Sequence, residues 1–212
     1  MAMPGAAPGI APKYRAFAPE FMHTPGETRA MHPMTRSNLQ SAFAGESQAH
    51  IRYLIYADKA DRDGFPNVAR LFRAITFAEQ IHATSHFQVM RNEVGAAQTV
   101  AGAGFGWGPT AQNLTVAIEG EDFEVAEMYP VYMAAAELQK ETGAGRSFSW
   151  AWEAEKTHAA LYKQAQAAVE GGQDLQAGTF SVCSQCGHTL VGEAPDRCPI
   201  CNAQKERYRA FA

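Results

Sequence analysis

Two Glu-x-x-His tetrads carry the residue types in this chain that are best suited to binding a redox metal. They are Glu79–His82 and Glu155–His158, and each follows another glutamate: Glu46 precedes the first tetrad by 33 residues, and Glu121 precedes the second by 34. Residues three apart in a helix lie on nearly one face, so the carboxylate of a tetrad can bridge two metal ions while its imidazole binds one of them. A set of four carboxylates and two imidazoles suits iron or manganese better than zinc.

The candidate ligands fall on apolar stripes of helical segments. Glu46 shares its stripe with Leu39, Phe43 and Tyr53, at the spacing of a buried helix face. The other three segments place Glu79, His82, Glu121, Glu124, Glu155 and His158 in the same way. Burying an unpaired carboxylate costs several kcal/mol, so five buried glutamates require cations. Glu119 and Glu153 lie about 200° around their helices from the candidate ligands, and we expect them on the outside.

Four helices are predicted, at residues 38–63, 67–92, 112–142 and 147–170. Short turns follow the first helix at Asp63–Pro66 and the third at Gly143–Gly145. Between the two pairs lies the glycine-rich segment 95–111, which can span about 56 Å when extended, longer than a helix of about 39 Å. Short, long and short connections are those of a ferritin-like four-helix bundle with a long crossover between its second and third helices. Pro130 is expected to kink the third helix.

The cysteines form a second candidate metal site near the C-terminus. Cys183–Cys186 and Cys198–Cys201 are two C-x-x-C pairs separated by 11 residues, a spacing that places four thiolates around one tetrahedral metal. Zinc would make this a structural ribbon, whereas iron would make it a one-electron carrier. We expect a small metal ribbon over residues 178–212, after a bundle over residues 37–172.

Composition restricts the remaining possibilities. The net charge of −4 argues against a nucleic-acid-binding surface. No apolar run approaches the roughly 18 residues of a membrane helix, and the start of the chain lacks a secretory h-region. Paired C-x-x-C motifs favour metal binding in a reducing compartment. We therefore expect a soluble, cytoplasmic protein without a membrane or nucleic-acid partner. Residues 1–36, with six prolines, are expected to form an extended arm whose role the sequence does not indicate.

The runs Ala42–Ala49 and Glu127–Pro130, together with both tetrads and the cysteine module, resemble rubrerythrin over about residues 37–212. The resemblance implies a non-haem di-iron peroxidase that reduces hydrogen peroxide to water in oxidative-stress defence, fused to a rubredoxin-like domain. It places the di-iron ligands at Glu46, Glu79, His82, Glu121, Glu124, Glu155 and His158, and a single iron or zinc ion at Cys183, Cys186, Cys198 and Cys201.

Further roles follow from the same resemblance. Glu124 would exchange with His82 as a ligand when the iron pair is reduced. Tyr53 and Tyr129 would donate hydrogen bonds to ligand carboxylates, although both are equally well explained as amphipathic core aromatics. Electrons would come from a separate NAD(P)H-dependent reductase. The rubredoxin-like iron would serve the neighbouring subunit of a head-to-tail homodimer, because the two centres of one chain would lie too far apart.

The roles of two histidines and two alternative functions of the protein remain open. His50 and His86 each lie one turn after a candidate ligand, so each can be a further ligand, a proton donor or a packed core residue. The same bundle could serve as a ferroxidase or iron-storage protein, which would not need the cysteine module. A zinc-ribbon adaptor that binds nucleic acid or protein is disfavoured by the buried carboxylates and the negative charge.

Overall fold

The computed structural model describes residues 30–212. Most of the arm expected over residues 1–36 lies outside the described residues. Helix α1 (Pro33–Arg62) begins with Pro33 at its N-terminus, where the missing N–H of proline costs no helical hydrogen bond. The last four residues of the expected arm, 33–36, therefore belong to the first helix.

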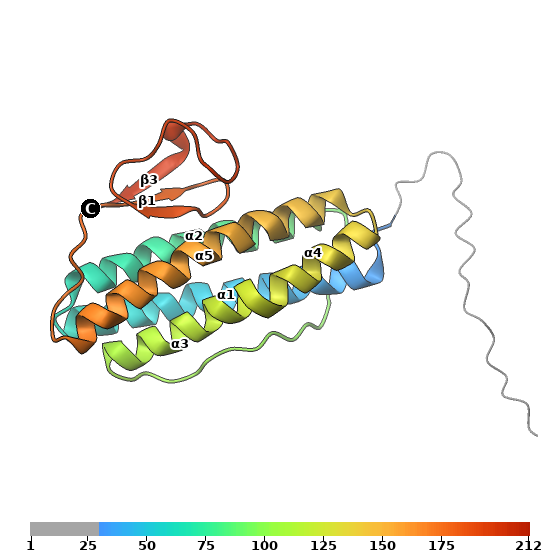
Figure 1. Ribbon diagram of the computed structural model, residues 1–212. Helices are drawn as coiled ribbons and strands as arrows, with labels where there is room; N and C mark the ends of the chain where they lie inside the picture. Colours follow the sequence, from blue (N-terminus) through green and yellow to red (C-terminus); the bar gives the residue numbers. More distant parts are fainter. Residues whose placement is uncertain (1–29) are drawn as a thin grey trace, which may run out of the picture. The chain divides into compact units, whose positions relative to one another are not determined.

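The chain is mainly helical, and four long helical rods lie side by side as a bundle (Figure 1). The first hairpin consists of α1 and α2 (Pro66–Val89). The third rod is made of α3 (Thr110–Phe123), the π-helical turn η1 (Glu124–Met128) and α4 (Tyr129–Leu138), and the fourth is α5 (Thr142–Glu170). The predicted ferritin-like bundle is thus confirmed. Among the helices of residues 30–212, none has the length and hydrophobicity needed to cross a membrane.

The third rod contains a widened, π-helical turn next to Pro130. Proline has no N–H to offer the carbonyl one turn before it, and its ring clashes with that carbonyl in a regular α-helix. The π-helical turn η1 directly precedes the segment that contains Pro130. A π-turn inserts one extra residue into the helix and is frequent at functional sites. It begins at Glu124, three residues after Glu121, so the irregular part of the helix includes a candidate ligand.

The boundary between the third and fourth rods differs from the prediction. Gly143 and Gly145 do not end the third helix; they lie in the first turn of α5. The chain reverses earlier, at Lys140, which has a left-handed backbone (φ 58°). A Cβ atom on Gly143 would lie 3.7 Å from Val89, and one on Gly145 would lie 4.0 Å from Ala136. These glycines therefore allow α5 to begin in close contact with its neighbours.

The predicted long crossover follows the outside of the bundle between α2 and α3 (Figure 1). Three contacts attach it to α1 or to the turn after it. The Ser41 hydroxyl donates to the Val100 carbonyl at 3.0 Å, and the Arg62 guanidinium lies over the Trp107 ring. Asp63 accepts hydrogen bonds from the backbone and the hydroxyl of Thr110 at 3.0 and 2.7 Å, which fixes the start of α3.

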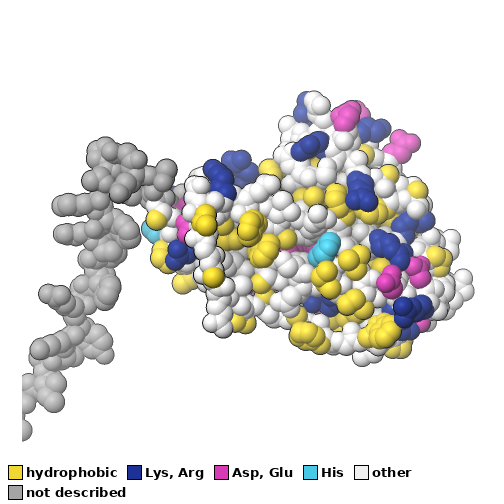
Figure 2. All heavy atoms as spheres, turned by 180° about the vertical axis from the view of Figure 1, so that it is seen from behind, with side chains coloured by type: hydrophobic (Ala, Val, Ile, Leu, Met, Phe, Trp, Pro, Cys, Tyr) yellow, Lys and Arg dark blue, Asp and Glu magenta, His cyan; other side chains and the backbone are white. Residues whose placement is uncertain are grey.

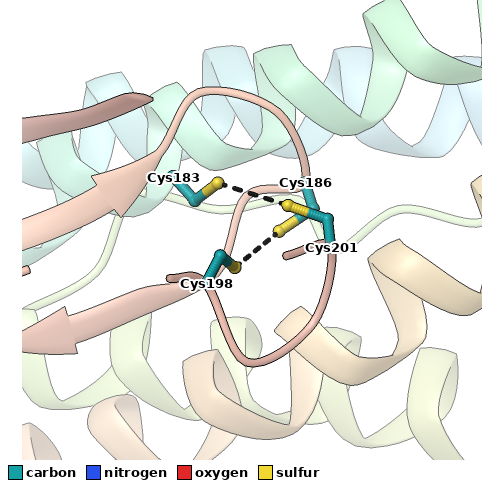
Figure 3. Close-up of side chains that lie close together, drawn as sticks. All are labelled: Cys183, Cys186, Cys198 and Cys201. Atoms are coloured by element: carbon teal, nitrogen blue, oxygen red, sulfur yellow. Dashed lines mark hydrogen bonds between the residues drawn. The ribbon is translucent and has the colours of Figure 1, made fainter. Parts of the chain in front are cut away.

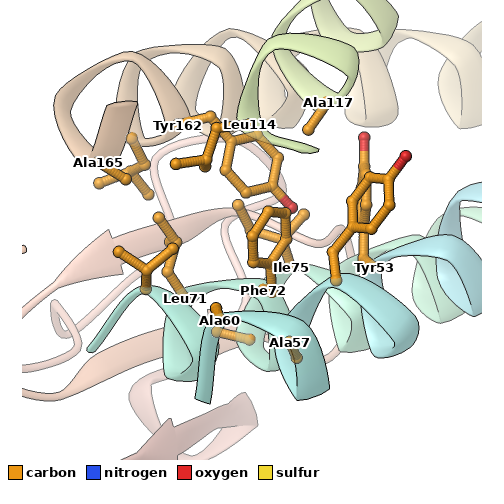
Figure 4. Packing of buried hydrophobic residues seen from close by; sticks show 14 of the residues in the cluster. Tyr53, Ala57, Ala60, Leu71, Phe72, Ile75, Leu114, Ala117, Tyr162 and Ala165 are labelled. Carbon is orange, nitrogen blue, oxygen red and sulfur yellow. The ribbon is translucent and has the colours of Figure 1, made fainter. Parts of the chain in front are cut away.

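An aromatic core fills part of the bundle (Figure 4). The rings of Tyr53, Phe72 and Tyr162 lie 5.1 to 5.9 Å apart in tilted or edge-to-face pairs, an arrangement that aromatic rings prefer. Leu71, Ile75 and several alanines complete the packing. Through the Tyr53 hydroxyl, this core borders the buried glutamates.

The C-terminal ribbon is a three-stranded antiparallel sheet in the order β2-β1-β3, formed by β1 (Phe180–Cys183), β2 (Thr189–Val191) and β3 (Tyr208–Phe211). The linker before it is held against α2. Asp174 accepts hydrogen bonds from the backbone N–H groups of Asn67 and Val68, two donors that the start of a helix leaves without partners. Phe180 is fully buried in the same apolar cluster as Phe72. The ribbon is therefore packed on the bundle of its own chain.

Candidate metal centres

The structure brings six of the seven predicted bundle ligands together from four helices. One group consists of Glu46 of α1, Glu79 and His82 of α2, and Glu155 of α5. The other shares the two tetrad glutamates and adds residues of α3 and α5; it consists of Glu79, Glu121, Glu155 and His158. Within each group the potential ligand atoms lie within 4.8 Å of one another. Two groups that share two carboxylates have the form of a two-metal site with bridging ligands.

Unpaired oxygens show that this cluster fits cations. Glu46, Glu79, Glu121 and Glu155 are at most 1% exposed. Oε2 of Glu46, Oε2 of Glu121 and Oε1 of Glu79 have no hydrogen-bond partner, while Oε1 of Glu155 lies 2.6 Å from His82 Nδ1. A buried carboxylate oxygen without a partner costs free energy, and four carboxylates in one place repel each other. Metal ions at the centre of the two groups would satisfy the unpaired oxygens.

The pKa values of the clustered side chains reflect the same crowding of buried carboxylates. Burial, and then the neighbouring carboxylates, raise the pKa values of Glu79 and Glu121 well above their ordinary value. Burial would also raise the pKa of Glu46, but hydrogen bonding and attraction to His82 bring it well below its ordinary value. The pKa of His158 falls to about 4 because burial disfavours its charged form. A neutral imidazole is the form that binds metal.

Glu124 lies outside both ligand groups. It is half-buried on the π-turn η1, and a Cβ atom on Gly45 would lie 4.0 Å from its Oε1. The carboxylates of Glu46 and Glu155 contribute to the raised pKa of Glu124, although burial is the larger cause. A cavity of about 380 Å³ opens beside it, under the crossover, and its lining includes Arg52 and Gly120. The structure therefore has His82 in the ligand cluster and Glu124 beside it.

Two tyrosines donate to the carboxylates of the cluster. The Tyr53 hydroxyl donates to Glu121 Oε1 at 2.7 Å, and the Tyr129 hydroxyl donates to Glu46 Oε1. Both rings are buried. Each hydrogen bond leaves the other oxygen of its carboxylate facing the cluster, so the tyrosines orient these side chains.

The two open histidines have different surroundings. His50 Nδ1 lies 2.9 Å from the carbonyl of Thr76 on α2, and the side chain is partly exposed. His86 is fully buried beside the cluster, 3.8 Å from Glu46 Oε1. Neither belongs to a ligand group. Glu119 is exposed and Glu153 pairs with Lys156, so the expectation that they lie outside the cluster is confirmed.

The four cysteines converge in the ribbon (Figure 3). The sulfur atoms of Cys183 and Cys201 are 3.7 Å apart, and those of Cys186 and Cys198 are 3.5 Å apart. A tetrahedral metal with bonds of about 2.3 Å separates its sulfur ligands by about 3.8 Å. Contact with Cys183 is the main cause that raises the pKa of Cys186 and lowers that of Cys198. The four sulfur atoms thus lie close enough together to share one metal ion.

The ribbon touches the bundle cluster directly. The Nε2 atom of His82 lies 3.1 Å from the carbonyl oxygen of Cys186. The Nε2 atom of His158 lies 3.3 Å from the carbonyl oxygen of Gly187 and 3.0 Å from the hydroxyl of Thr189. Each imidazole thus turns Nδ1 to the carboxylates and Nε2 to the ribbon. Such outer hydrogen bonds fix the orientation of a metal-binding imidazole.

This contact contradicts the premise of one expectation, namely that the two centres of one chain lie far apart. The resemblance implied that the cysteine module serves a neighbouring subunit, because the two centres of one chain lie too far apart. Within the described residues the module contacts both tetrad histidines of its own chain. The linker that Asp174 holds at the start of α2 and the buried Phe180 place it there.

Sequence reasoning did not identify the ribbon groups that contact the histidines. Two are backbone carbonyls, which leave no trace in residue type, and Thr189 is an ordinary strand residue. The glycine at position 187 is the sequence feature that does point to this contact, because a side chain there would collide with His82. Its backbone is left-handed (φ 81°), and a Cβ atom there would lie 2.1 Å from His82 Nε2.

The bundle cluster and the thiolate cage together define a ferritin-like di-iron protein with a rubredoxin-like domain. The chain belongs to the rubrerythrin family. The rubrerythrin family model matches residues 37–166, and the model of the rubrerythrin rubredoxin-like domain matches residues 182–209. The bundle therefore carries a di-iron site and the ribbon a four-cysteine metal site, as in an oxidoreductase-type protein.

Relatives extend over most of the chain. Rubrerythrin-2 of Clostridium acetobutylicum is 43% identical over 178 residues, which are 84% of this chain and 97% of the relative. Nigerythrin of Nitratidesulfovibrio vulgaris is 32% identical over 182 residues, 84% of this chain and 86% of that protein. A solved structure of nigerythrin in its fully reduced, all-ferrous state superimposes with a TM-score of 0.74 and 29% identity, covering 88% of this chain and 89% of that one.

Proposed function

We propose that this protein reduces hydrogen peroxide to water at the di-iron site, with electrons delivered through iron in the four-cysteine site, in defence against oxidative stress. One observation carries the proposal: His82 faces the carboxylate cluster with one ring nitrogen and the Cys186 carbonyl with the other. A one-electron carrier attached to a ligand of the di-iron site suits an enzyme that must be re-reduced in every cycle. A protein that only stores iron has no use for this connection.

The proposed iron ligands are Glu46, Glu79, His82, Glu121, Glu155 and His158, with Glu124 as an exchanging ligand. Iron bound there supplies the two electrons that cleavage of the O–O bond requires. The protein residues would hold the metal ions in place. Glu79 and Glu155, which both ligand groups share, would bridge the two ions. Tyr53 and Tyr129 hold the remaining two carboxylates by hydrogen bonds.

His82 and Glu124 are proposed to alternate as ligands. The carboxylate anion is favoured on the more highly charged ferric ion, and the neutral imidazole on the ferrous ion. In this proposal, an arrangement with His82 in the cluster and Glu124 beside it would be that of the reduced form. The π-turn η1, in which Glu124 lies, supplies a local irregularity at which the helix can adjust.

The cavity beside Glu124 is the proposed route for peroxide. Its lining includes Gly45 and Gly120, which lack side chains, and the Arg52 side chain. Its volume of about 380 Å³ is ample for a molecule with two heavy atoms. Peroxide that enters here would meet Glu124 before the deeper carboxylates.

Iron in the thiolate cage is proposed to return the electrons one at a time. The path from Cys186 Sγ to His82 Nε2 runs through the side chain and carbonyl of one residue and then a single hydrogen bond. We propose a separate NAD(P)H-dependent reductase as the upstream donor. Zinc in the cage would conduct no electrons, because zinc has no redox chemistry.

A homodimer in a reducing, cytoplasmic environment completes the proposal. The face turned away from the viewer in Figure 1 carries several clusters of hydrophobic side chains (Figure 2). On α1 and α2, Ile51 and Phe87 are 54% and 59% exposed and line one groove with Phe43. Exposed apolar patches commonly mark protein interfaces. The four cysteines are free thiols rather than disulfides, which suits a reducing compartment.

Anaerobic titration tests the proposed reaction. Protein reduced with dithionite is titrated with peroxide, and iron and zinc are counted in the same sample. We expect rapid oxidation of the bundle irons at about one peroxide per iron pair. If dioxygen oxidises the same protein much faster than peroxide does, the ferroxidase alternative replaces the peroxidase.

A further inference from the structure

A chain of hydrogen bonds leads from the edge of the bundle to Glu46 through groups that the proposed reaction has not yet used. The hydroxyls of Ser85 and Ser147 are 2.8 Å apart. The Ser147 hydroxyl lies 2.8 Å from His86 Nδ1, and His86 Nε2 lies 3.1 Å from the Tyr129 hydroxyl. That hydroxyl in turn donates to Glu46 Oε1. Four side chains from three helices thus form one continuous connection to a candidate iron ligand.

Burial separates the two ends of this chain. Ser85 is partly exposed, whereas Ser147, His86 and Tyr129 are 3%, 0% and 0% exposed. The Phe148 ring packs against both the His86 ring and the Tyr129 ring, with centroid distances of 5.4 and 6.1 Å. The connection therefore begins where water can reach it and continues through apolar packing.

The hydrogen bonds of this chain can all be oriented in one direction, toward Glu46. An ionised carboxylate only accepts, so the Tyr129 hydroxyl donates to Glu46 and its oxygen is free to accept from His86 Nε2. In a neutral imidazole with its proton on Nε2, Nδ1 is an acceptor. Nδ1 then accepts from Ser147, whose oxygen accepts from Ser85. Every proton in the chain then points toward the cluster.

We propose that Ser85, Ser147, His86 and Tyr129 form a proton relay from solvent to Glu46. The inference rests on the proposed peroxidase function, in which one peroxide, two electrons and two protons give two waters: the O–O bond breaks and two O–H bonds form. The electrons come from the iron centres and each proton comes from water at Ser85. In one transfer every group of the relay gives up the proton it donates and gains one from the group before it. The relay thus delivers one proton to Glu46 and keeps its own count unchanged. Glu46 passes that proton to a peroxide oxygen, where the new O–H bond forms, and becomes ionised again before the second transfer.

The test measures proton exchange in the resting, iron-loaded full chain, so it does not depend on peroxide turnover. Protein with ¹³C-labelled tyrosine is transferred into D₂O, and infrared spectra follow deuterium uptake at the Tyr129 hydroxyl, assigned by its loss in Tyr129→Phe. Ser147→Ala removes one hydroxyl of the relay. The matched control is Ser47→Ala, whose hydroxyl bonds only to the Phe43 carbonyl of its own helix among the described contacts.

We expect Ser147→Ala to slow this exchange at least tenfold, and to raise the solvent isotope effect on single-turnover oxidation by peroxide, with iron content unchanged. Ser47→Ala should match the wild type in both measurements. Exchange at the wild-type rate in a folded, iron-loaded Ser147→Ala protein overturns the relay. If Ser147→Ala does not retain iron, Ser85→Val decides, because it fills the partly exposed entrance with methyl groups: slower exchange supports the relay and unchanged exchange overturns it. Failure of the peroxidase proposal would appear instead as absence of peroxide oxidation with exchange intact in the wild type.

Discussion

The carbonyl oxygen of Cys186 lies 3.1 Å from Nε2 of His82, so the thiolate cage is hydrogen-bonded to a side chain of the bundle cluster. The same imidazole has its Nδ1 atom 2.6 Å from Glu155 Oε1. One side chain thus joins the two metal centres of a chain. Changes at this contact should alter the transfer of electrons while leaving each centre intact.

Substitution of Gly187 by alanine should uncouple the two centres. The new Cβ atom would lie 2.1 Å from His82 Nε2, and the ribbon must move to accommodate it. We expect both metal sites to keep their iron and their absorption spectra. Re-reduction of the bundle irons by the thiolate iron should slow by tenfold or more, measured by stopped-flow absorbance after a peroxide pulse.

Gly192 provides the matched control. It also has a left-handed backbone (φ 97°), but no atom lies within 4 Å of the position of its Cβ. Both alanine variants incur the same backbone cost, roughly 1 to 2 kcal/mol. Equal electron-transfer rates in Gly187→Ala and Gly192→Ala would show that the contact with His82 does not matter.

Glu124→Ala should separate ligand exchange from metal binding. Because Glu124 lies outside both ligand groups, the variant should retain helicity and most of its iron. Peroxide turnover should fall on the order of 10- to 100-fold, the usual cost of losing a group that supports a metal site. Glu127→Ala, an exposed change on the same π-turn, should have little effect. Loss of all iron and of helicity in Glu124→Ala would mean that this residue is structural.

Metal-free protein should become less stable as the pH rises above 6.5. The pKa of His82 is raised well above 6.5, because attraction to Glu155 and other carboxylates outweighs the effect of burial. Burial and neighbouring carboxylates raise the pKa of Glu79 well above 4.5. The folded chain therefore holds protons in this window that the unfolded chain has released, and stability falls with pH. The lowered pKa values of His158 and His86 change stability only below about pH 6.5.

Urea unfolding of chelator-treated protein at pH 6.5 and pH 8.5 measures this effect. The midpoint should fall at the higher pH without metal, and iron should abolish the decrease because metal ions replace the protons. In Glu79→Gln the dependence should be weaker. A metal-free midpoint that rises between these two pH values contradicts the electrostatic description of the cluster.

With zinc in the ribbon, the protein should react with peroxide once and then stop. Zinc fits a tetrahedral cage of four thiolates but carries no electrons. Protein with iron in the bundle and zinc in the ribbon should therefore oxidise at the normal rate with the first peroxide, and then stop in the presence of reductase and NAD(P)H. Continued turnover at the all-iron rate would show that electrons reach the bundle by another path.

Much of the bundle could be predicted from sequence because its signals are periodic. Glu46 and Glu79 lie within apolar stripes, and the two tetrads give the ligands a fixed spacing along their helices. The π-turn at Glu124 was less accessible. Pro130 indicates that the helix is irregular nearby. It does not indicate the form of the irregularity, because either a kink or an inserted residue can accommodate the hydrogen bond that proline cannot make.

Contacts between distant segments could not be predicted. The carbonyl of Cys186 carries no sequence signal, and the position of the ribbon depends on how Asp174 and Phe180 attach the linker to the bundle. The role of Ser147 depends on the rotation of α5 against α2, which brings its hydroxyl to His86. These are properties of packing, which a pattern within one helix does not contain.

Oxidation of the thiolate iron by peroxide tests the central claim most directly. Fully reduced, anaerobic protein is mixed with excess peroxide or with dioxygen, and the absorbance of the ferric tetrathiolate is followed in the wild type and in Glu79→Ala, which removes a carboxylate shared by both ligand groups. We predict rapid oxidation by peroxide in the wild type, much slower oxidation by dioxygen, and loss of the rapid phase in Glu79→Ala. Equal rates in the two proteins, or faster oxidation by dioxygen, would contradict a peroxidase in which the bundle reacts and the ribbon supplies its electrons.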